Sequence, residues 1–119
     1  MIININDNQF KVKIARTEEE KSEGMMGKKF NQTFNGLLFT MGRGKHCFWM
    51  KNCIIPLDII FIRDGEIKVI HHDCPPCKKE NDKDCERYCG NGSLVLELKG
   101  GTCDLLGISE GDKVKIIDR

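Results

Sequence analysis

The segment from Leu57 to Ile62 constrains the fold more than any other part of the chain. It reads Leu-Asp-Ile-Ile-Phe-Ile, so every residue except Asp58 is apolar. A strand this apolar is expected to have both of its faces covered. The carboxylate of Asp58 then needs hydrogen-bond donors to offset the cost of its desolvation. The segment therefore predicts a buried central strand that carries one polar spot.

Alternating apolar and polar residues predict further strands on either side of this segment. Residues 3–5 and 10–14 alternate around Asp7-Asn8, which predicts an opening hairpin. Thr17 and Glu20 have capping-box spacing, which predicts a short helix from Glu18 to about Met25. Other strands are expected at residues 37–40, 46–50, 66–70, 93–99 and 113–116, with one helical turn at 102–106. We therefore expect a mainly β protein: a single compact domain over residues 1–119, barrel-like or two-sheet and antiparallel, with two short helices.

Charge and hydropathy exclude some classes of partner. The 119 residues include 19 Lys and Arg against 18 Asp and Glu, a net charge of +1, which argues against a dedicated nucleic-acid-binding protein. No apolar run approaches the ~20 residues that cross a bilayer, so no membrane association is expected. The start of the chain, Met1-Ile2-Ile3-Asn4, lacks the pattern of a signal peptide, and we expect a cytoplasmic protein.

A polar, cysteine-bearing loop is expected over residues 73–92. It holds Cys74, Cys77, Cys85 and Cys89. Four thiolates in two close pairs can bind structural zinc, and the metal would order a loop that has little apolar content. Disulfides and free thiols are the alternatives, although a reducing compartment disfavours disulfides. A thioredoxin-type redox role for Cys74-Pro75-Pro76-Cys77 is disfavoured because no helix with an apolar face follows it.

A second group of residues predicts a ligand groove. Its members combine soft apolar side chains with a few polar ones, as ligand sites do: Met26, Trp49, Met50, Lys51, Asn52 and Asp58. The apolar members have core packing as their alternative role. Asp58 could bind a ligand or act as a general base, but no titratable partner is evident nearby in the sequence. We therefore prefer a structural role for Asp58, in which it accepts hydrogen bonds from backbone N–H groups or a charge-assisted hydrogen bond from a basic side chain.

Several blocks of the chain, in order, resemble one known family. They are Gly24-Met25-Met26-Gly27-Lys28, Gly36-Leu37-Leu38-Phe39, Phe48-Trp49-Met50-Lys51-Asn52, Ile55-Pro56-Leu57-Asp58-Ile59-Ile60-Phe61-Ile62 and Val95-Leu96-Glu97-Leu98. With Asp64-Gly65 and Gly111-Asp112-Lys113-Val114, this pattern is similar to the domain-of-unknown-function 192 family of small bacterial, archaeal and phage proteins. The resemblance implies a compact β-rich domain and brings no established activity or catalytic residue.

The resemblance also bears on the cysteines. Pro76-Cys77 and Cys85-Glu86-Arg87-Tyr88 resemble a cysteine pair of the family, which implies a Cys77–Cys85 disulfide as the first alternative to zinc. Cys74 and Cys89 are additions to that pattern. We expect a non-enzymatic protein that binds a small ligand or a protein partner near Trp49 and Asp58. The alternative is a small hydrolase or lyase that uses Asp58 with Lys51 and Asn52.

Overall fold

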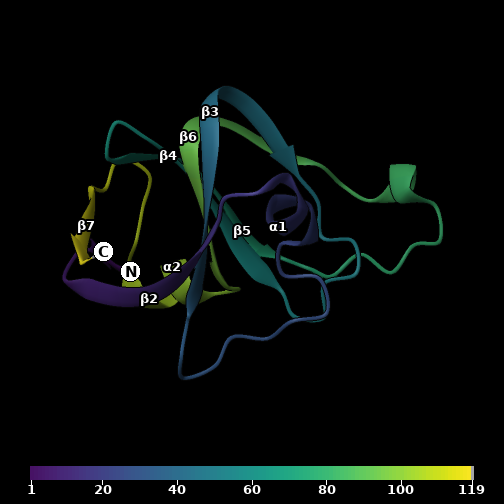
Figure 1. Cartoon of the computed structure of the whole chain (residues 1–119), viewed down its shortest axis with the longest axis horizontal. Helices are drawn as coiled ribbons and strands as arrows, with labels where there is room; N and C mark the ends of the chain where they lie inside the picture. Colours follow the sequence, from purple (N-terminus) through teal and green to yellow (C-terminus); the bar gives the residue numbers. More distant parts are fainter. Residues whose placement is uncertain (119) are drawn as a thin grey trace.

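The computed structural model describes residues 1–118 and shows a strongly curled sheet of seven strands (Figure 1). Arg119, the last residue of the expected domain, lies outside the described residues. The strands are β1 (Ile2–Ile5), β2 (Asn8–Ala15), β3 (Gly36–Phe48), β4 (Leu57–Arg63), β5 (Glu66–Cys74), β6 (Tyr88–Lys99) and β7 (Val114–Asp118). The helices are α1 (Glu18–Glu23), α2 (Thr102–Leu106) and the 3₁₀ turn η1 (Asp82–Asp84). The mainly β, barrel-like class with two short α-helices is confirmed.

The strands lie in the order β5-β4-β6-β3-β2-β1-β7. Hairpins join β1 to β2 and β4 to β5, and β6 pairs with β4 on one side and β3 on the other, all antiparallel. The expected antiparallel arrangement has one exception, because β2 and β3 run parallel. A parallel pair needs a long crossover, and residues 16–35, which include α1, supply it.

Both faces of β4 are buried, as its sequence predicts. Ile60 and Ile62 belong to one apolar cluster, inside the curl of the sheet, which also receives Cys103 of α2. Leu57, Ile59 and Phe61 belong to a second cluster on the opposite face, which Met25 helps to cover. Figure 1 shows α1 and α2 on different sides of the central strands. The two short helical segments thus mark the two faces of the sheet.

The cysteine-bearing segment is shorter than the expected loop at 73–92. β5 continues to Cys74 and β6 begins at Tyr88, so the connection covers residues 75–87. The expected strands at 37–40 and 46–50 are one long strand, β3, whose outer half pairs with the start of β6 from Gly44↔Gly92 to Phe48↔Tyr88. This pairing joins residues far apart in sequence, and it orders a stretch that looks irregular in the sequence. In Figure 1 the remaining loop projects from the sheet with η1 at its tip.

Local sequence signals give the expected local structures. Thr17 and Glu20 form both hydrogen bonds of a capping box at the start of α1, with Glu20 N donating to Thr17 Oγ1 at 3.1 Å. The opening hairpin turns at Asn6 and Asp7, one residue earlier than expected, and both residues have positive φ. Asn and Asp tolerate this conformation, which suits a two-residue hairpin turn.

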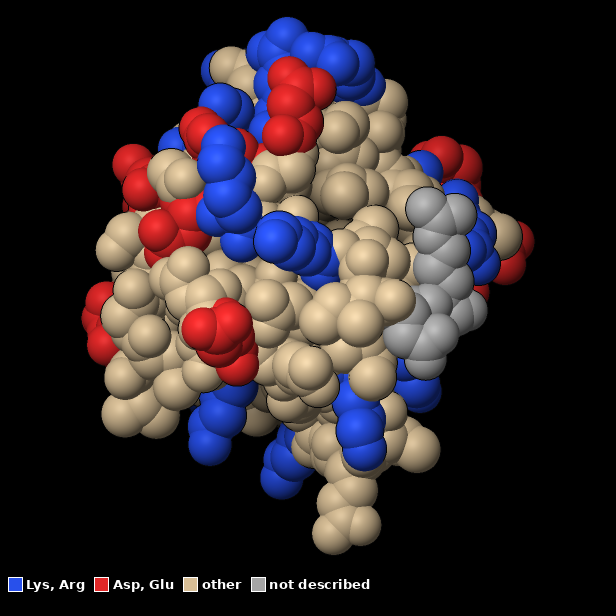
Figure 2. Space-filling model, turned by 90° about the vertical axis from the view of Figure 1, so that its left-hand side faces the viewer, with Lys and Arg blue, Asp and Glu red and all other residues tan. Residues whose placement is uncertain are grey.

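The surface has charges of both signs. Figure 2 shows lysines and arginines interspersed with carboxylates and uncharged residues on the face that it displays. Within the described residues, no helix is both long enough and apolar enough to cross a bilayer.

Candidate functional site

Asp58 is completely buried and fully bound to the backbone. Its Oδ1 accepts hydrogen bonds from Asp73 N at 2.8 Å and Gly101 N at 3.1 Å, and its Oδ2 accepts one from Cys103 N at 2.8 Å. Gly101 has a φ of 90°, which glycine adopts without strain, and this turn presents its N–H to the carboxylate. Asp58 therefore connects β4 to the end of β5 and to the start of α2. This geometry supports the structural role that we preferred from the sequence.

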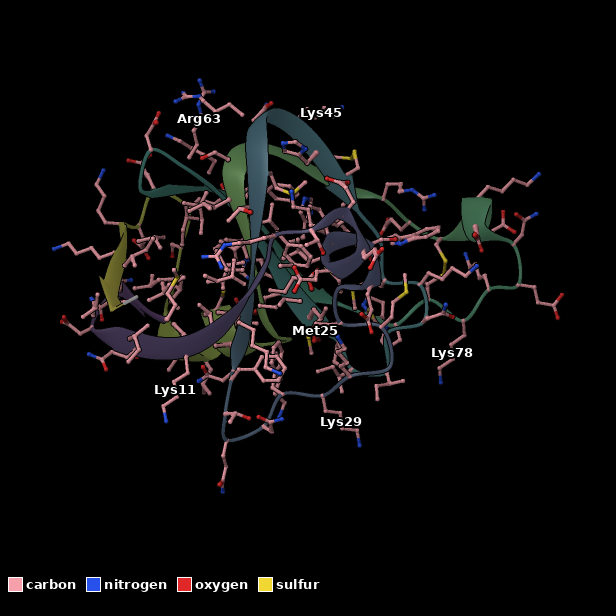
Figure 3. The ribbon with its side chains drawn as sticks, viewed as in Figure 1. Lys11, Met25, Lys29, Lys45, Arg63 and Lys78 are labelled. Carbon is pink, nitrogen blue, oxygen red and sulfur yellow. A yellow bond between two sulfur atoms is a disulfide. The ribbon has the colours of Figure 1, made fainter. Side chains whose placement is uncertain are left out.

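A pocket of about 450 Å³ opens on the other face of the sheet, beside α1. Its walls combine apolar and polar groups. The apolar side chains come from β3 and from the residues that follow α1 and β3: Met25, Met26, Phe39, Met41, Phe48, Trp49 and Cys53. His46 of β3 also lines the pocket. Charged residues of α1 lie at its rim: Glu18, Lys21 and Glu23. Met25 is 2 % exposed. In Figure 3 it lies near the middle of the molecule, between Lys11 of β2 and the projecting loop that carries Lys78.

Glu97 of β6 contributes a buried carboxyl group to this pocket. The residue is 3 % exposed, and its cross-strand neighbours are Leu37 on β3 and Ile59 on β4. Among the described residues, its Oε1 has no hydrogen-bond partner. A buried acceptor without a donor is rare in folded proteins and calls for an explanation. Burial raises the pKa of the Glu97 carboxyl to about 8.

Cys53 contributes a thiol to the same pocket. The residue is 7 % exposed and its thiol forms no disulfide. Burial raises the pKa of the Cys53 thiol to about 12, and the charge of Glu97 adds to this effect. Cys53 therefore stays a neutral thiol near pH 7, where it is a poor nucleophile.

The structure separates the residues of the expected groove. Trp49 and Met26 line the pocket with Glu97. Met50 is buried and borders a different depression, which also contains Pro75 and Tyr88. Asp58 shares a face with Ile60 and Ile62 and so points away from the pocket.

The remaining two groove residues have partners elsewhere. Lys51 forms an ion pair with Asp82 of η1, and its Nζ lies 5.7 Å from the centre of the Trp49 ring. Asn52 is an exposed turn residue with a φ of 60°, and its carbonyl oxygen accepts a hydrogen bond from Gly27 N at 2.8 Å. Neither side chain is among the hydrogen-bond partners of Asp58. This geometry gives no support to a hydrolase or lyase built from Asp58, Lys51 and Asn52.

The four cysteines of the expected zinc site do not converge. Cys77 forms a disulfide with Cys85, as the family resemblance implies, and Cys89 forms one with Cys47 of β3. Cys74 is a buried thiol whose Sγ donates to the carbonyl oxygen of His71. Across residues 1–118, no group of three or more His, Cys, Asp or Glu side chains is placed to hold a metal ion. The zinc hypothesis therefore has no support, because disulfides occupy three of its four proposed ligands.

Sequence reasoning missed Glu97 as a site residue. The alternation of Leu94, Leu96 and Leu98 with Val95 and Glu97 suggests a strand with one buried face, and Glu97 then belongs to the exposed one. A signal was present nevertheless. Glu97 is the single polar residue in Leu94–Leu98, just as Asp58 is in Leu57–Ile62.

Together, the fold and the pocket define a class of protein. It is a small domain with one curled β-sheet, and a buried carboxyl group lines a pocket on the outer face of that sheet. Residues 1–116 match the DUF192 family (Uncharacterized ACR), and the chain belongs to this family.

Two solved structures are similar to the chain over nearly its whole length. One is a protein of unknown function from Novosphingobium aromaticivorans DSM 12444, with 30% identity, a TM-score of 0.83, and coverage of 97% of this chain and 84% of that one. The other is described as a putative transcription regulator from Sinorhizobium meliloti 1021, with 28% identity, a TM-score of 0.83, and coverage of 96% of this chain and 91% of that one. No curated protein matches the chain.

Proposed function

We propose that this chain is a non-enzymatic binding protein for a small organic ligand that occupies the pocket beside α1. The unpartnered Oε1 of Glu97 is the observation that carries the proposal. A pKa near 8 means that ionising this carboxyl in the folded protein costs about 5 kcal/mol more than ionising it in water. A ligand that donates a hydrogen bond to Oε1 would recover part of this free energy.

The size and the walls of the pocket support the same conclusion. Its volume of about 450 Å³ is in the usual range for small-molecule sites, which bury an apolar ligand and orient it through few polar groups. Here Phe48 and Trp49 provide aromatic surface, Met25 and Met26 provide adaptable thioethers, and Glu97 provides a buried polar group.

The state of the pocket thiol favours binding over nucleophilic catalysis. Nucleophilic catalysis needs an activated nucleophile, commonly with a lowered pKa. The pKa of Cys53 is raised instead, so its thiol suits a site that holds a ligand without attacking it.

A role in transcription regulation through DNA binding has less support here, although the Sinorhizobium structure is described as that of a putative transcription regulator. Proteins that bind nucleic acids carry an excess of positive charge. This chain has a net charge of only +1, and Figure 2 shows basic and acidic side chains mixed on one face.

NMR of the methionine methyl groups tests the proposal. Small aryl fragments added to the full chain should shift the methyl signals of Met25 and Met26. The signal of Met1, which packs against the other apolar cluster, serves as an internal reference. The proposal fails if no fragment moves the Met25 and Met26 signals at millimolar concentration.

Substitution of Trp49 separates a role in binding from a role in packing. We expect Trp49→Ala to weaken fragment binding about tenfold, because aromatic side chains dominate the energetics of binding sites. The loss of unfolding free energy should be only about 1 kcal/mol, since Trp49 is half-buried. Trp49→Phe, which keeps an aromatic ring, is the matched control and should retain most of the affinity. An unchanged affinity in Trp49→Ala with a large loss of stability would assign Trp49 to packing alone.

A further inference from the structure

The pocket carries information about the charge of its ligand. Three carboxyl side chains line it, those of Glu18, Glu23 and Glu97, against one ammonium group, that of Lys21. The Nζ of Lys21 lies 3.9 Å from Glu18 Oε1, and the Nζ of Lys28 lies 3.3 Å from Glu23 Oε1, so the rim charges are paired with one another. When Glu97 ionises, it adds a negative charge that has no ion-pair partner among the described residues, which disfavours an anionic ligand and favours a cationic one.

The apolar walls also suit a cation with an apolar body. Aromatic faces attract ammonium and guanidinium groups. The Trp49 ring already attracts two such groups, because the guanidinium carbon of Arg87 lies 4.3 Å and the Nζ of Lys51 lies 5.7 Å from its centre. Phe39 and Phe48 add ring surface to the same pocket and pack edge to face with centres 5.0 Å apart.

We propose that the ligand is an amine with an apolar body, whose ammonium group donates a hydrogen bond to Glu97 Oε1 deep in the pocket. This inference rests on the proposed function and specifies its ligand class. An ammonium group supplies the donor that Oε1 lacks and the charge that a buried carboxylate needs. A neutral alcohol supplies only the donor, and a carboxylate supplies neither.

Binding of an amine is coupled to release of a proton. Near pH 7 the Glu97 carboxyl is mostly protonated because burial raises its pKa to about 8. When the ammonium group enters, the carboxyl proton leaves to the buffer, and the ammonium keeps its own protons and bonds to the resulting carboxylate. Most of the carboxyl proton is then released for each amine bound near pH 7, and less of it as the pH rises above the pKa of Glu97. The other titratable side chains around Glu97 are those of Glu18, Lys21, Glu23, His46, Cys53 and Cys74.

Calorimetry of the full chain with three matched probes tests the inference. The probes are phenethylamine, phenethyl alcohol and phenylacetate, which share an aryl body and differ in the charge of their polar end. We expect phenethylamine to bind at least about tenfold more tightly than the other two. Its binding heat near pH 7 should depend on the ionisation enthalpy of the buffer, as proton release requires. Glu97→Gln should abolish both the preference and the buffer dependence, whereas Glu80→Gln, which removes an exposed charge in the projecting loop, should leave both unchanged.

The outcomes distinguish the inference from the proposed function. If the alcohol or the carboxylate shifts the Met25 and Met26 signals and binds as well as the amine, the amine inference is wrong and the pocket remains a ligand site. If no probe moves these signals, the proposed function fails as well. The buffer dependence is measured on the unmodified protein, so a Glu97→Gln variant that does not fold leaves the test intact. Amine binding without proton release contradicts the inference.

Discussion

Asp58 and Glu97 are two buried carboxyl groups on neighbouring strands, and the protein treats them differently. The paired positions Asp58↔Leu98 and Ile59↔Glu97 place them one residue apart across the β4–β6 pair. They point to opposite faces of the sheet, because neighbouring positions alternate along a strand. Asp58 accepts three backbone hydrogen bonds, whereas Oε1 of Glu97 has no partner among the described residues.

The difference separates a structural role from a binding role. A carboxylate whose hydrogen bonds all come from the backbone holds elements together and has little capacity left for a ligand. A buried carboxyl without a donor costs stability and is useful only when something else provides the donor. Burial alone therefore does not mark a functional site, and the hydrogen-bond partners of each group decide the matter.

The largest expected effect comes from removing Asp58. Asp58→Ala leaves three backbone N–H groups without an acceptor, and we expect a loss of about 4 kcal/mol in the free energy of unfolding, measured in urea. Asp58→Asn keeps one acceptor oxygen and should lose about 2 kcal/mol. The matched control is Asp104→Ala, which removes an exposed carboxylate of α2 and should change stability by less than about 0.5 kcal/mol. An Asp58→Ala variant as stable as the control would contradict the structural role.

Glu97 should show the opposite behaviour, because its ionisation destabilises the fold. In the unfolded chain its carboxyl has the ordinary pKa of 4.5, and in the folded chain this pKa is about 8. Between these values the unfolded state binds fewer protons than the folded state, so stability falls as pH rises. The contribution of Glu97 is fully present below about pH 4.5, is lost progressively up to about pH 8, and is constant above it.

Substitution of Glu97 isolates its contribution to the pH dependence of stability. Relative to Glu97→Gln, the unmodified protein should lose about 3 kcal/mol of unfolding free energy between about pH 5 and pH 7.5, measured by urea titration at each pH. Subtracting the unfolding free energy of the variant from that of the unmodified protein at each pH removes the contribution of the other titrating groups. Glu80→Gln is the control and should follow the unmodified protein throughout. Parallel pH profiles for Glu97→Gln and the unmodified protein would show that Glu97 ionises as easily folded as unfolded.

The smallest of these effects is expected in the projecting loop, away from both carboxyl groups. The double variant Cys77→Ser, Cys85→Ser removes a cross-link between residues 8 apart in sequence, and we expect it to lower the unfolding free energy by about 2 kcal/mol. Hydrogen exchange should become faster at residues 78–84 and stay unchanged in β4 and β6. The pH dependence assigned to Glu97 should persist. Its loss in this variant would mean that the loop, and not the sheet, sets the environment of Glu97.

Much of the fold follows from local sequence patterns. The apolar run of β4 predicts a strand covered on both faces, and Thr17 with Glu20 predicts the start of α1. The parallel β2–β3 pair and the long β3 strand were not predicted, because both depend on which distant segments meet. The two disulfides differ in the same respect: one could be expected from the sequence and the other could not. The Cys77–Cys85 disulfide is implied by the family resemblance, whereas Cys47–Cys89 joins residues 42 apart and depends on the register of β3 against β6.

The two carboxyl groups mark the limit of what the sequence alone determined. An aspartate inside an unbroken apolar strand must be buried and must find donors, so the structural role of Asp58 could be inferred from its neighbours in the chain. Glu97 lies in an alternating strand that is compatible with an exposed face. Only the tertiary structure decided its burial, because Met25 and Cys53 come from distant parts of the chain to cover that face. The physical reason is that burial of a side chain depends on what packs over it, and local sequence periodicity does not contain that information.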